Sequence, residues 1–392
     1  MAASIEYRYD LNIVYYEDKK EHKFNSEHIH NLLIDYDYEN KNRPMLFVTL
    51  SIDRNILDHM IINKENGYVI LEINKYKKGF SSRIKEKYIK DKFIYFIDDT
   101  ALNKTKSLDY AGDESEKEDK FHIVKLGLMK KDTIDNNKVL INDIVNNTSM
   151  INIIYKHMKH MNLLIEPLDN NNVMDNFIIP PITTITNFVD YLDRTCNLYN
   201  TNYRLFFDHD ITYLISSKGN PIKSKNDDIN SFIIYVKDNM TVESKEQGIF
   251  IDRLNNRYEI NVDATDVDVF KDKDTIKSTT SVIAVDSEGR TNKANISESD
   301  VDKIYLKRIN NSNLDYIDNQ VDKLKDLTIV NIIKNELDTS LITINKEYII
   351  KNYKDMKDND GKYILNRKRE IYTRDAESFV LTCALTLAKK ES

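Results

Sequence analysis

The sequence has 392 residues, 41% of them hydrophobic and 10% aromatic, which is enough for packed cores in roughly two to four domains of about 100–200 residues each. Its eight glycines argue against a Rossmann or P-loop fold, because both need glycine-rich turns around phosphates. Its formal net charge of −7 argues against nucleic-acid or anionic-membrane binding, which depends on Lys and Arg.

Neither the apolar runs nor the cysteines indicate membrane insertion or secretion. No run of about 18 apolar residues occurs, so no membrane span is expected. The first residues lack the basic and then apolar pattern of a signal peptide. Cys196 and Cys383 lie in apolar surroundings, which predicts reduced, buried thiols rather than a disulfide.

The N-terminal part is predicted to be a compact barrel or sandwich of strands. Tyr7, Tyr9, Leu11, Ile13 and Tyr15 share one face of the first strand, because they alternate with polar residues. One helix is expected over 55–62, with Ile56, Met60 and Ile61 turned inward. The strands are expected over 5–16, 29–38, 45–51, 68–76 and 93–97.

The next part is predicted to mix helices with strands. An acidic stretch at 113–119 indicates an exposed loop, and strands are expected over 121–129 and 139–145. Thr148 and Ser149 can cap a following helix over 150–161. Its buried face is predicted to hold Ile151, Ile154, Tyr155, Met158 and Met161.

The segment 178–238 is the strongest local signal. Pro181 suits a first helical turn, so a helix is predicted over 182–199, with Asp190, Asp193, Arg194 and Asn197 on its polar face. Strands over 203–207 and 212–215 follow, joined by Asp208–Asp210, and another strand is expected over 232–236. The buried face of the helix is predicted to hold Ile182, Ile185, Phe188, Val189, Leu192, Cys196 and Tyr199.

The remainder is predicted to be mostly strands separated by polar turns. The last of these alternates clearly, so one of its faces is expected to be buried. The strands are expected over 248–251, 257–262, 267–270, 281–285, 303–309, 327–333, 340–344, 348–350, 363–365 and 379–387.

Histidine pairs are the first candidates for chemistry. His157 and His160 are three residues apart on a predicted helix, and His28 and His30 are two apart on a predicted strand. A zinc site needs further ligands, and no glutamate lies between either pair as in metalloproteases. Ordinary surface or partly packed histidines are the better interpretation, so no metal site is predicted.

Three acidic motifs also have structural explanations. Asp208-His209-Asp210 resembles an acid–base triplet but lies between two strands, where carboxylates cap turns. Residues 358–361 resemble a calcium loop, but Met356 and Arg367 occupy positions that need carboxylates, so a hairpin between 353 and 363 is preferred. Residues 263–268 lack the glycine turn of such loops. We therefore predict no catalytic residue, no cofactor and no enzyme.

The order of motifs over about the first 240 residues resembles the baseplate hub proteins of contractile phage tails from Gram-positive hosts. Related hubs also occur in phage-tail-like bacteriocin particles, and the sequence leaves both open. The resemblance is carried by 33–40, Arg43-Pro44, 163–170, Ile178-Ile-Pro-Pro181, Phe188, Tyr191-Leu192, 199–203, 206–208 and 212–217.

This resemblance implies a β-rich α+β chain with two tail-tube-like barrels and intervening α/β and β-rich domains. The expected domains are a first barrel at 1–105, a helical α/β domain at 106–202, a second barrel at 203–240 plus 338–392, and an insertion at 241–337. Three chains would form a pseudo-sixfold ring, and an acidic lumen would repel the DNA that passes through it.

The resemblance also implies the partners and the place of the protein. The partners would be two further copies of the chain, the tail tube or a tube-initiator protein, the central spike and other baseplate proteins, with the tape-measure protein as one candidate. The protein would be assembled in the host cytoplasm and reside in the virion, without membrane insertion. Two alternatives stay open: a cell-wall hydrolase using Asp208 or His209, and another tube-like adaptor of the tail tip.

Overall fold

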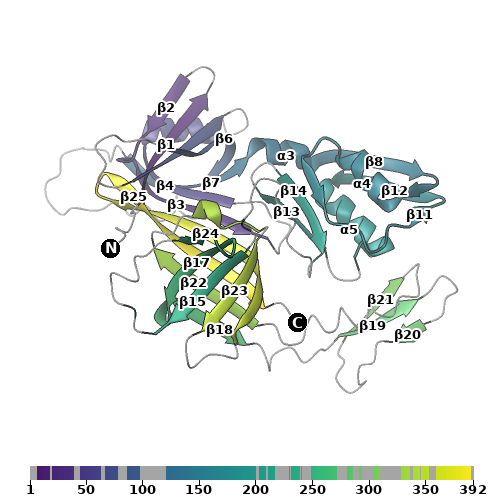
Figure 1. The fold of residues 1–392 in the computed structure, drawn as a ribbon. Helices are drawn as coiled ribbons and strands as arrows, with labels where there is room; N and C mark the ends of the chain where they lie inside the picture. Colours follow the sequence, from purple (N-terminus) through teal and green to yellow (C-terminus); the bar gives the residue numbers. More distant parts are fainter. Residues whose placement is uncertain are drawn as a thin grey trace.

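The computed structural model contains a large mixed β-sheet and a helical module beside it (Figure 1). The described residues are 7–17, 20–38, 45–62, 67–77, 86–97, 121–199, 203–208, 211–216, 229, 231–238, 240, 249–271, 280–285, 291–293, 303–308, 328–335, 339–344, 346–352 and 359–389.

Strands from both ends of the chain close into a barrel. In the described part, the antiparallel pairings run β1–β5–β6–β7–β4–β3–β24–β25 and return to β1 through the pair Tyr9 and Phe379. β2 (Lys20–Phe24) pairs with β1, and α1 (Arg54–Ile62) follows β4. The barrel strands are β1 (Tyr7–Glu17), β3 (Ile29–Asp37), β4 (Met45–Asp53), β5 (Tyr68–Lys77), β6 (Glu86–Ile97), β7 (Phe121–Lys130), β24 (Gly361–Asp375) and β25 (Ser378–Lys389).

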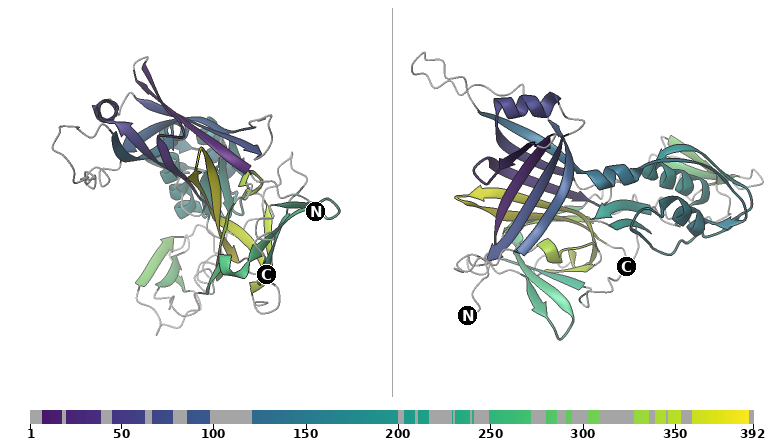
Figure 2. Two further views of the ribbon diagram at one scale, coloured as in Figure 1. Left: turned by 90° about the vertical axis from the view of Figure 1, so that its left-hand side faces the viewer. Right: turned by 90° about the horizontal axis from the view of Figure 1, so that it is seen from above.

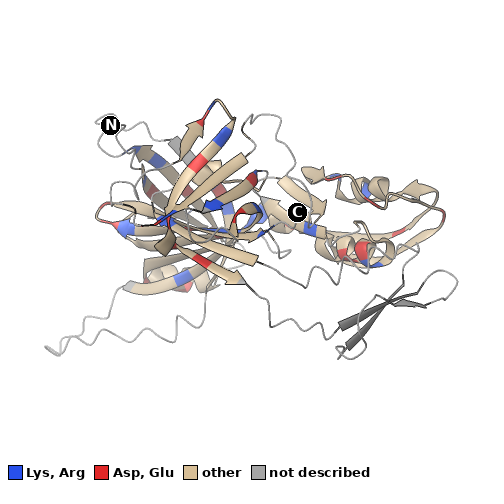
Figure 3. Ribbon diagram, turned by 60° about the horizontal axis from the view of Figure 1, so that its bottom comes forward, with Lys and Arg blue, Asp and Glu red and all other residues tan. Residues whose placement is uncertain are grey.

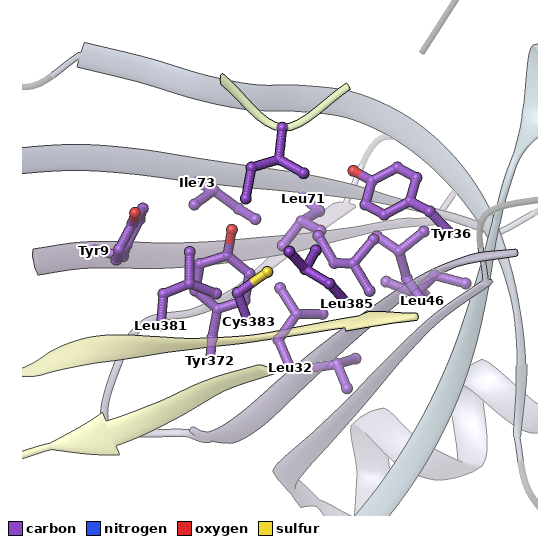
Figure 4. Close-up of a cluster of buried hydrophobic side chains, with 14 of the residues drawn as sticks. Tyr9, Leu32, Tyr36, Leu46, Leu71, Ile73, Tyr372, Leu381, Cys383 and Leu385 are labelled. Atoms are coloured by element: carbon purple, nitrogen blue, oxygen red, sulfur yellow. The ribbon is translucent and has the colours of Figure 1, made fainter. Parts of the chain in front are cut away.

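The barrel interior is filled by the predicted alternating apolar residues. Tyr9, Leu11, Ile13 and Tyr15 of β1 are all buried, which confirms the face predicted for that strand. Side chains from β1, β3, β4, β5, β24 and β25 meet in one interior (Figure 4). The prediction that Ile61 points inward is wrong: Leu57 and Met60 bury one side of α1, and Ile61, about 100° further round, is 44% exposed.

A second arc of strands continues from the same hairpin. β15 pairs in parallel with both β17 and β23, so the sheet is mixed. The 3₁₀ turn η1 (Ala264–Asp266) joins β17 to β18. In order, the described arc contains β16 (Phe250–Asp252), β17 (Arg257–Asp263), β15 (Ser231–Lys237), β23 (Glu347–Asn352), β24, β25, β22 (Thr328–Asn335) and β18 (Val267–Lys271).

The strand expected at 340–344 is wrong, because the chain forms a 3₁₀ turn there, η3 (Thr339–Leu341). The amide of Ile342 donates to the carbonyl of Thr339 at 3.1 Å. Ile342 and Ile344 are both buried in the large core, so the apolar alternation is satisfied by packing without a partner strand.

The hairpin of β24 and β25 belongs to both the closed barrel and the second arc. Tyr363 near the start of β24 pairs with β23, whereas Arg367–Thr373 pair with β3. A β-bulge between Leu365 and Arg367 separates these two stretches. The yellow hairpin accordingly lies between the two groups of strands in Figure 1. The hairpin predicted between 353 and 363 is confirmed by the antiparallel pairing of β23 with β24, although 353–358 lie outside the described residues. The prediction missed the length of β24, which continues to Asp375.

The helical module projects to one side of the large sheet (Figure 2) and has its own core, which includes Ile154, Phe188 and Leu192. β13 and β14 form a sheet with β10, not with β15. β19 (Thr280–Val285), β20 (Thr291–Lys293) and β21 (Lys303–Arg308) form a separate small sheet. The module contains α3 (Lys131–Asn137), β8 (Lys138–Val145), β9 (Thr148–Ser149), α4 (Met150–Met158), β10 (Leu163–Ile165), β11 (Val173–Met174), β12 (Phe177–Thr184), α5 (Ile185–Cys196), β13 (Tyr203–Asp208) and β14 (Ile211–Ser216).

The helix predicted from Pro181 begins three residues later than residue 182. Both prolines lie in β12, whose ladder with β8 is irregular between Ile179 and Ile182, as expected where a ring replaces the N–H donor. Thr184 caps α5 by accepting a hydrogen bond from the amide of Asn187 at 3.2 Å.

Two further details of the helices differ from the prediction. α4 ends at Met158, and Tyr155 is 46% exposed, so it does not belong to the buried face. On α5, Asp193 is buried and accepts a hydrogen bond from the amide of Leu198 at 3.2 Å. Asn197 takes a left-handed conformation that ends this helix.

Candidate functional site

The histidine pairs do not converge on a common point. His157 contacts the Asp143 carboxylate at 3.1 Å, whereas His160 lies beyond the end of α4 and contacts the carbonyl of Asn136 at 3.0 Å. Burial lowers the pKa of His157, although Asp143 opposes this effect. His28 and His30 likewise have separate partners, the Asn25 and Ser51 side chains. Separate local partners are what we expect of ordinary surface or partly packed histidines.

The acidic motifs have structural roles where they are described. Asp263 is buried and accepts hydrogen bonds from the amides of Thr265 and Met240, both at 3.0 Å. Gly361 pairs with Ile350 in the β23–β24 hairpin. His209, Asp210, Asp358 and the side chain of Asp208 lie outside the described residues.

The described ranges contain neither a metal-binding cluster nor a membrane-spanning helix. No group of three or more His, Cys, Asp or Glu side chains there could hold a metal ion. No helix of the described chain is long and apolar enough to cross a membrane. Cys196 and Cys383 are both free thiols, as predicted, although only Cys383 is fully buried.

The most unusual arrangement of charges lies in the shared hairpin of β24 and β25, where the closed barrel meets the second arc. We call the region around Lys368 and Glu370 the barrel junction and take it as the candidate functional site. Lys368 and Glu370 of β24 point inward with side chains 4% and 0% exposed, and their charged groups lie 3.3 Å apart. Lys368 also donates to the carbonyl of Ile342 in the turn after η3, and Tyr372 donates to Glu370 at 3.0 Å. A buried pair satisfied in this way fixes positions within the core.

Arg204 attaches the helical module to this junction. Its Nε donates to the carbonyl of Tyr38 at 3.0 Å and its Nη2 donates to the carbonyl of Leu365 at 3.1 Å. Tyr38 follows the end of β3, and Leu365 is the last residue before the bulge in β24. Next to this contact, the Phe206 ring packs edge-on against Tyr38 at 5.2 Å.

Sequence reasoning missed these three charged residues. Lys368 and Glu370 alternate with Arg367, Arg369 and Ile371, so charged residues lie on both faces of the strand. The sequence there lacks the alternation of apolar and polar residues that would predict a strand. One signal was available: Arg204 is a charged residue flanked by the aromatic and aliphatic residues Tyr203 and Leu205–Phe207 of its strand, which is typical of an internal contact.

Both signs of charge occur along the described strands of the large sheet. Lys and Arg residues are interspersed with Asp and Glu along the strands in Figure 3. Outward-facing Asp35, for example, lies between Arg367 and Arg369, with Arg369 Nε at 3.3 Å from its carboxylate. The surface charges in this view are therefore largely balanced by their neighbours.

Comparison with known proteins adds a family and a fold. The family model described as bacteriophage PBS1 gene 109 protein matches residues 3–390. No curated protein matches the sequence. Among solved structures, the tail protein from Neisseria meningitidis MC58 superimposes with a TM-score of 0.50 at 10% identity, over 98% of this chain and 97% of that chain.

Two other structures are similar by the same measure. The 43 kDa tail protein of prophage MuSo2 from Shewanella oneidensis gives a TM-score of 0.49 at 9% identity, over 97% of both chains. The Francisella PdpA-VgrG complex gives 0.49 at 12% identity, over 99% of this chain but 53% of that chain, so the present chain spans about half its length.

At 10% identity, the likeness to the Neisseria protein shows the fold alone: a β-rich α+β tail-protein fold with a large mixed sheet. The sequence match is independent of that likeness and covers nearly the whole chain. The chain belongs to the family of the bacteriophage PBS1 gene 109 protein.

Proposed function

We propose that this protein is a structural baseplate hub of a contractile tail, a homotrimer that joins the hexameric tail tube to the trimeric central spike and nucleates tube assembly. The observation that carries the proposal is that the large sheet of one chain forms a closed barrel and a second arc of strands around one shared hairpin. Three such chains present six similar barrels, so one ring can match sixfold and threefold partners.

The strand pairings support domain boundaries that differ from the expected ones. In the described residues, the first tube-like barrel takes β1 to β7 and part of the shared hairpin. The middle domain extends from α3 through β14, and the second barrel takes β15–β18 and β22–β25. Within the insertion expected at 241–337, the small sheet of β19–β21 is then the separate unit.

The proposed partners follow from this place in the particle. The ring would contact the tail tube or its initiator on one side, the spike on the other, and further baseplate proteins around it, with the tape-measure protein as one candidate. DNA would pass through the lumen without a dedicated binding site, and the protein would remain in the virion.

A non-enzymatic role is part of the proposal. Membership of a phage protein family and the shared tail-protein fold favour function through assembly rather than catalysis. In the described residues, the buried charges at the barrel junction contact one another and backbone carbonyls, which suits a rigid scaffold.

The mass in solution tests this proposal. Light scattering after size exclusion should give three times the monomer mass of 46.1 kDa for the protein alone. Because the ring must hold the spike, co-expressed spike should co-elute at three copies of each chain. A monomer that never associates with tube or spike proteins under any condition would contradict the proposal.

A further inference from the structure

Two separately packed cores meet at the sheet of β13 and β14. Leu205 and Phe207 face the core of the helical module, whereas Phe206 and Tyr213 belong to the core of the barrels. Phe206 and Tyr213 stack at 4.9 Å between centroids. The small sheet is therefore buried on both faces, and its barrel-facing side is where the module can communicate with the rest of the chain.

Arg204 lies on that side, and its acceptors come from two strands that are far apart in sequence. The carbonyl of Tyr38 accepts the hydrogen bond from Arg204 just beyond the end of β3. The amide of Tyr38 donates to the carbonyl of Asn366 at 2.9 Å. The carbonyl of Leu365 points to Arg204 at the bulge, where the ladder of β24 and β25 is interrupted. Bulges of this kind re-aim backbone groups out of the ladder.

We propose that Arg204 is a positioning residue that locks the helical module onto the completed junction of the two barrels. Its guanidinium fits two carbonyls that are adjacent only when β3 and β24 are paired and the bulge is in place. A planar fork with fixed donors suits this geometry, whereas a lysine could reach one carbonyl at a time. The lock would make the orientation of the module depend on the shared hairpin. It concerns this chain alone and is independent of the trimer proposal.

Hydrogen–deuterium exchange on the full-length protein tests the lock. In Arg204→Met, amides of β13, β14 and the end of β3 should exchange roughly tenfold faster or more, since losing one hydrogen bond to a charged group corresponds to at least that factor. Amides of β5, on the far side of the first barrel, should keep their protection. Arg204→Lys should fall between the two proteins, because it keeps the charge without the fork.

The matched control is Arg194→Met, the same change at an exposed position on α5 of the same module. It should leave the exchange of β13 and β14 unchanged. Equal loss of protection in β5 and β13 would overturn the proposal, because it would show a general loss of stability. Unchanged exchange in Arg204→Met would also overturn it, as would failure of both Arg204 variants to fold, since each core is packed separately.

Discussion

At the scale of single residues, the buried pair Lys368 and Glu370 should be the most sensitive charged site of the junction. Removing one partner leaves the other charge buried, so Lys368→Met should lower the free energy of unfolding by about 3–5 kcal/mol. Chemical denaturation measures this change. The double variant Lys368→Met/Glu370→Leu should cost less than Lys368→Met alone, because no buried charge remains.

Lys362 of the same strand provides the matched control for this prediction. It pairs with Glu347 at 2.8 Å, but its side chain is 61% exposed. Lys362→Met should therefore cost less than about 1 kcal/mol. Equal losses for Lys362→Met and Lys368→Met would show that burial of the pair has no energetic consequence.

At the scale of elements, the bulge at Asn366 determines which residues of the second half of β24 point inward. Leu365 and Asn366 are both buried, and this single irregularity sets the alternation of the residues that follow. Inserting one alanine between Asn366 and Arg367 should turn Lys368 outward and Arg367 inward, together with the residues after them, because the bulge already holds the one extra residue that the ladder accommodates. We expect loss of soluble, cooperatively unfolding protein, measured by yield and by thermal unfolding.

The substitution Asn366→Ala separates register from side-chain chemistry. It keeps the residue count, so the alternation after the bulge is preserved and the protein should remain folded with a lower melting temperature. An insertion variant that melts at the temperature of the unaltered protein would refute the role given to the bulge.

The elements also show what sequence alone could predict. Strands such as β1, β5 and β25 are predictable because apolar residues recur at every second position along most of one face. The second half of β24 was missed because its inward face carries Lys368 and Glu370. The closing pair of Tyr9 and Phe379 could not be predicted, since no local pattern specifies which distant strands pair.

The candidate site was less predictable than the fold. The motifs that drew attention, such as His157 with His160, are recognisable by spacing but have separate local partners. Arg204 matters because of two backbone carbonyls, and backbone acceptors leave no trace in residue identity. The sequence could not predict this site because the site is formed by tertiary contacts.

At the scale of the whole molecule, stability should fall in alkali. Burial raises the pKa of Cys196 and of Tyr363 to about 12, from ordinary values of 9.0 and 10.0. It also raises the pKa of Tyr95, Tyr199 and Tyr203. In this range the folded state keeps protons that the unfolded state has lost, so the free energy of unfolding decreases as pH rises from about 9 to about 12.

Urea denaturation at pH 8 and at pH 10.5 measures this dependence. The midpoint should be lower at pH 10.5, and Cys196→Ala should reduce the part of the difference that its thiol contributes. Equal midpoints at the two pH values would mean that these groups ionise as readily in the folded protein as in the unfolded chain.

The central claim is that one chain supplies two barrels of a common ring. Symmetry then fixes the stoichiometry, because six barrels require three chains. The most direct measurement is a cryo-electron microscopy reconstruction of the assembled particle at a resolution that separates strands. We expect three copies around the tail axis, with both barrels of each copy in one ring between tube and spike. Six copies in that ring, or a single barrel of each copy facing the axis, would contradict the account.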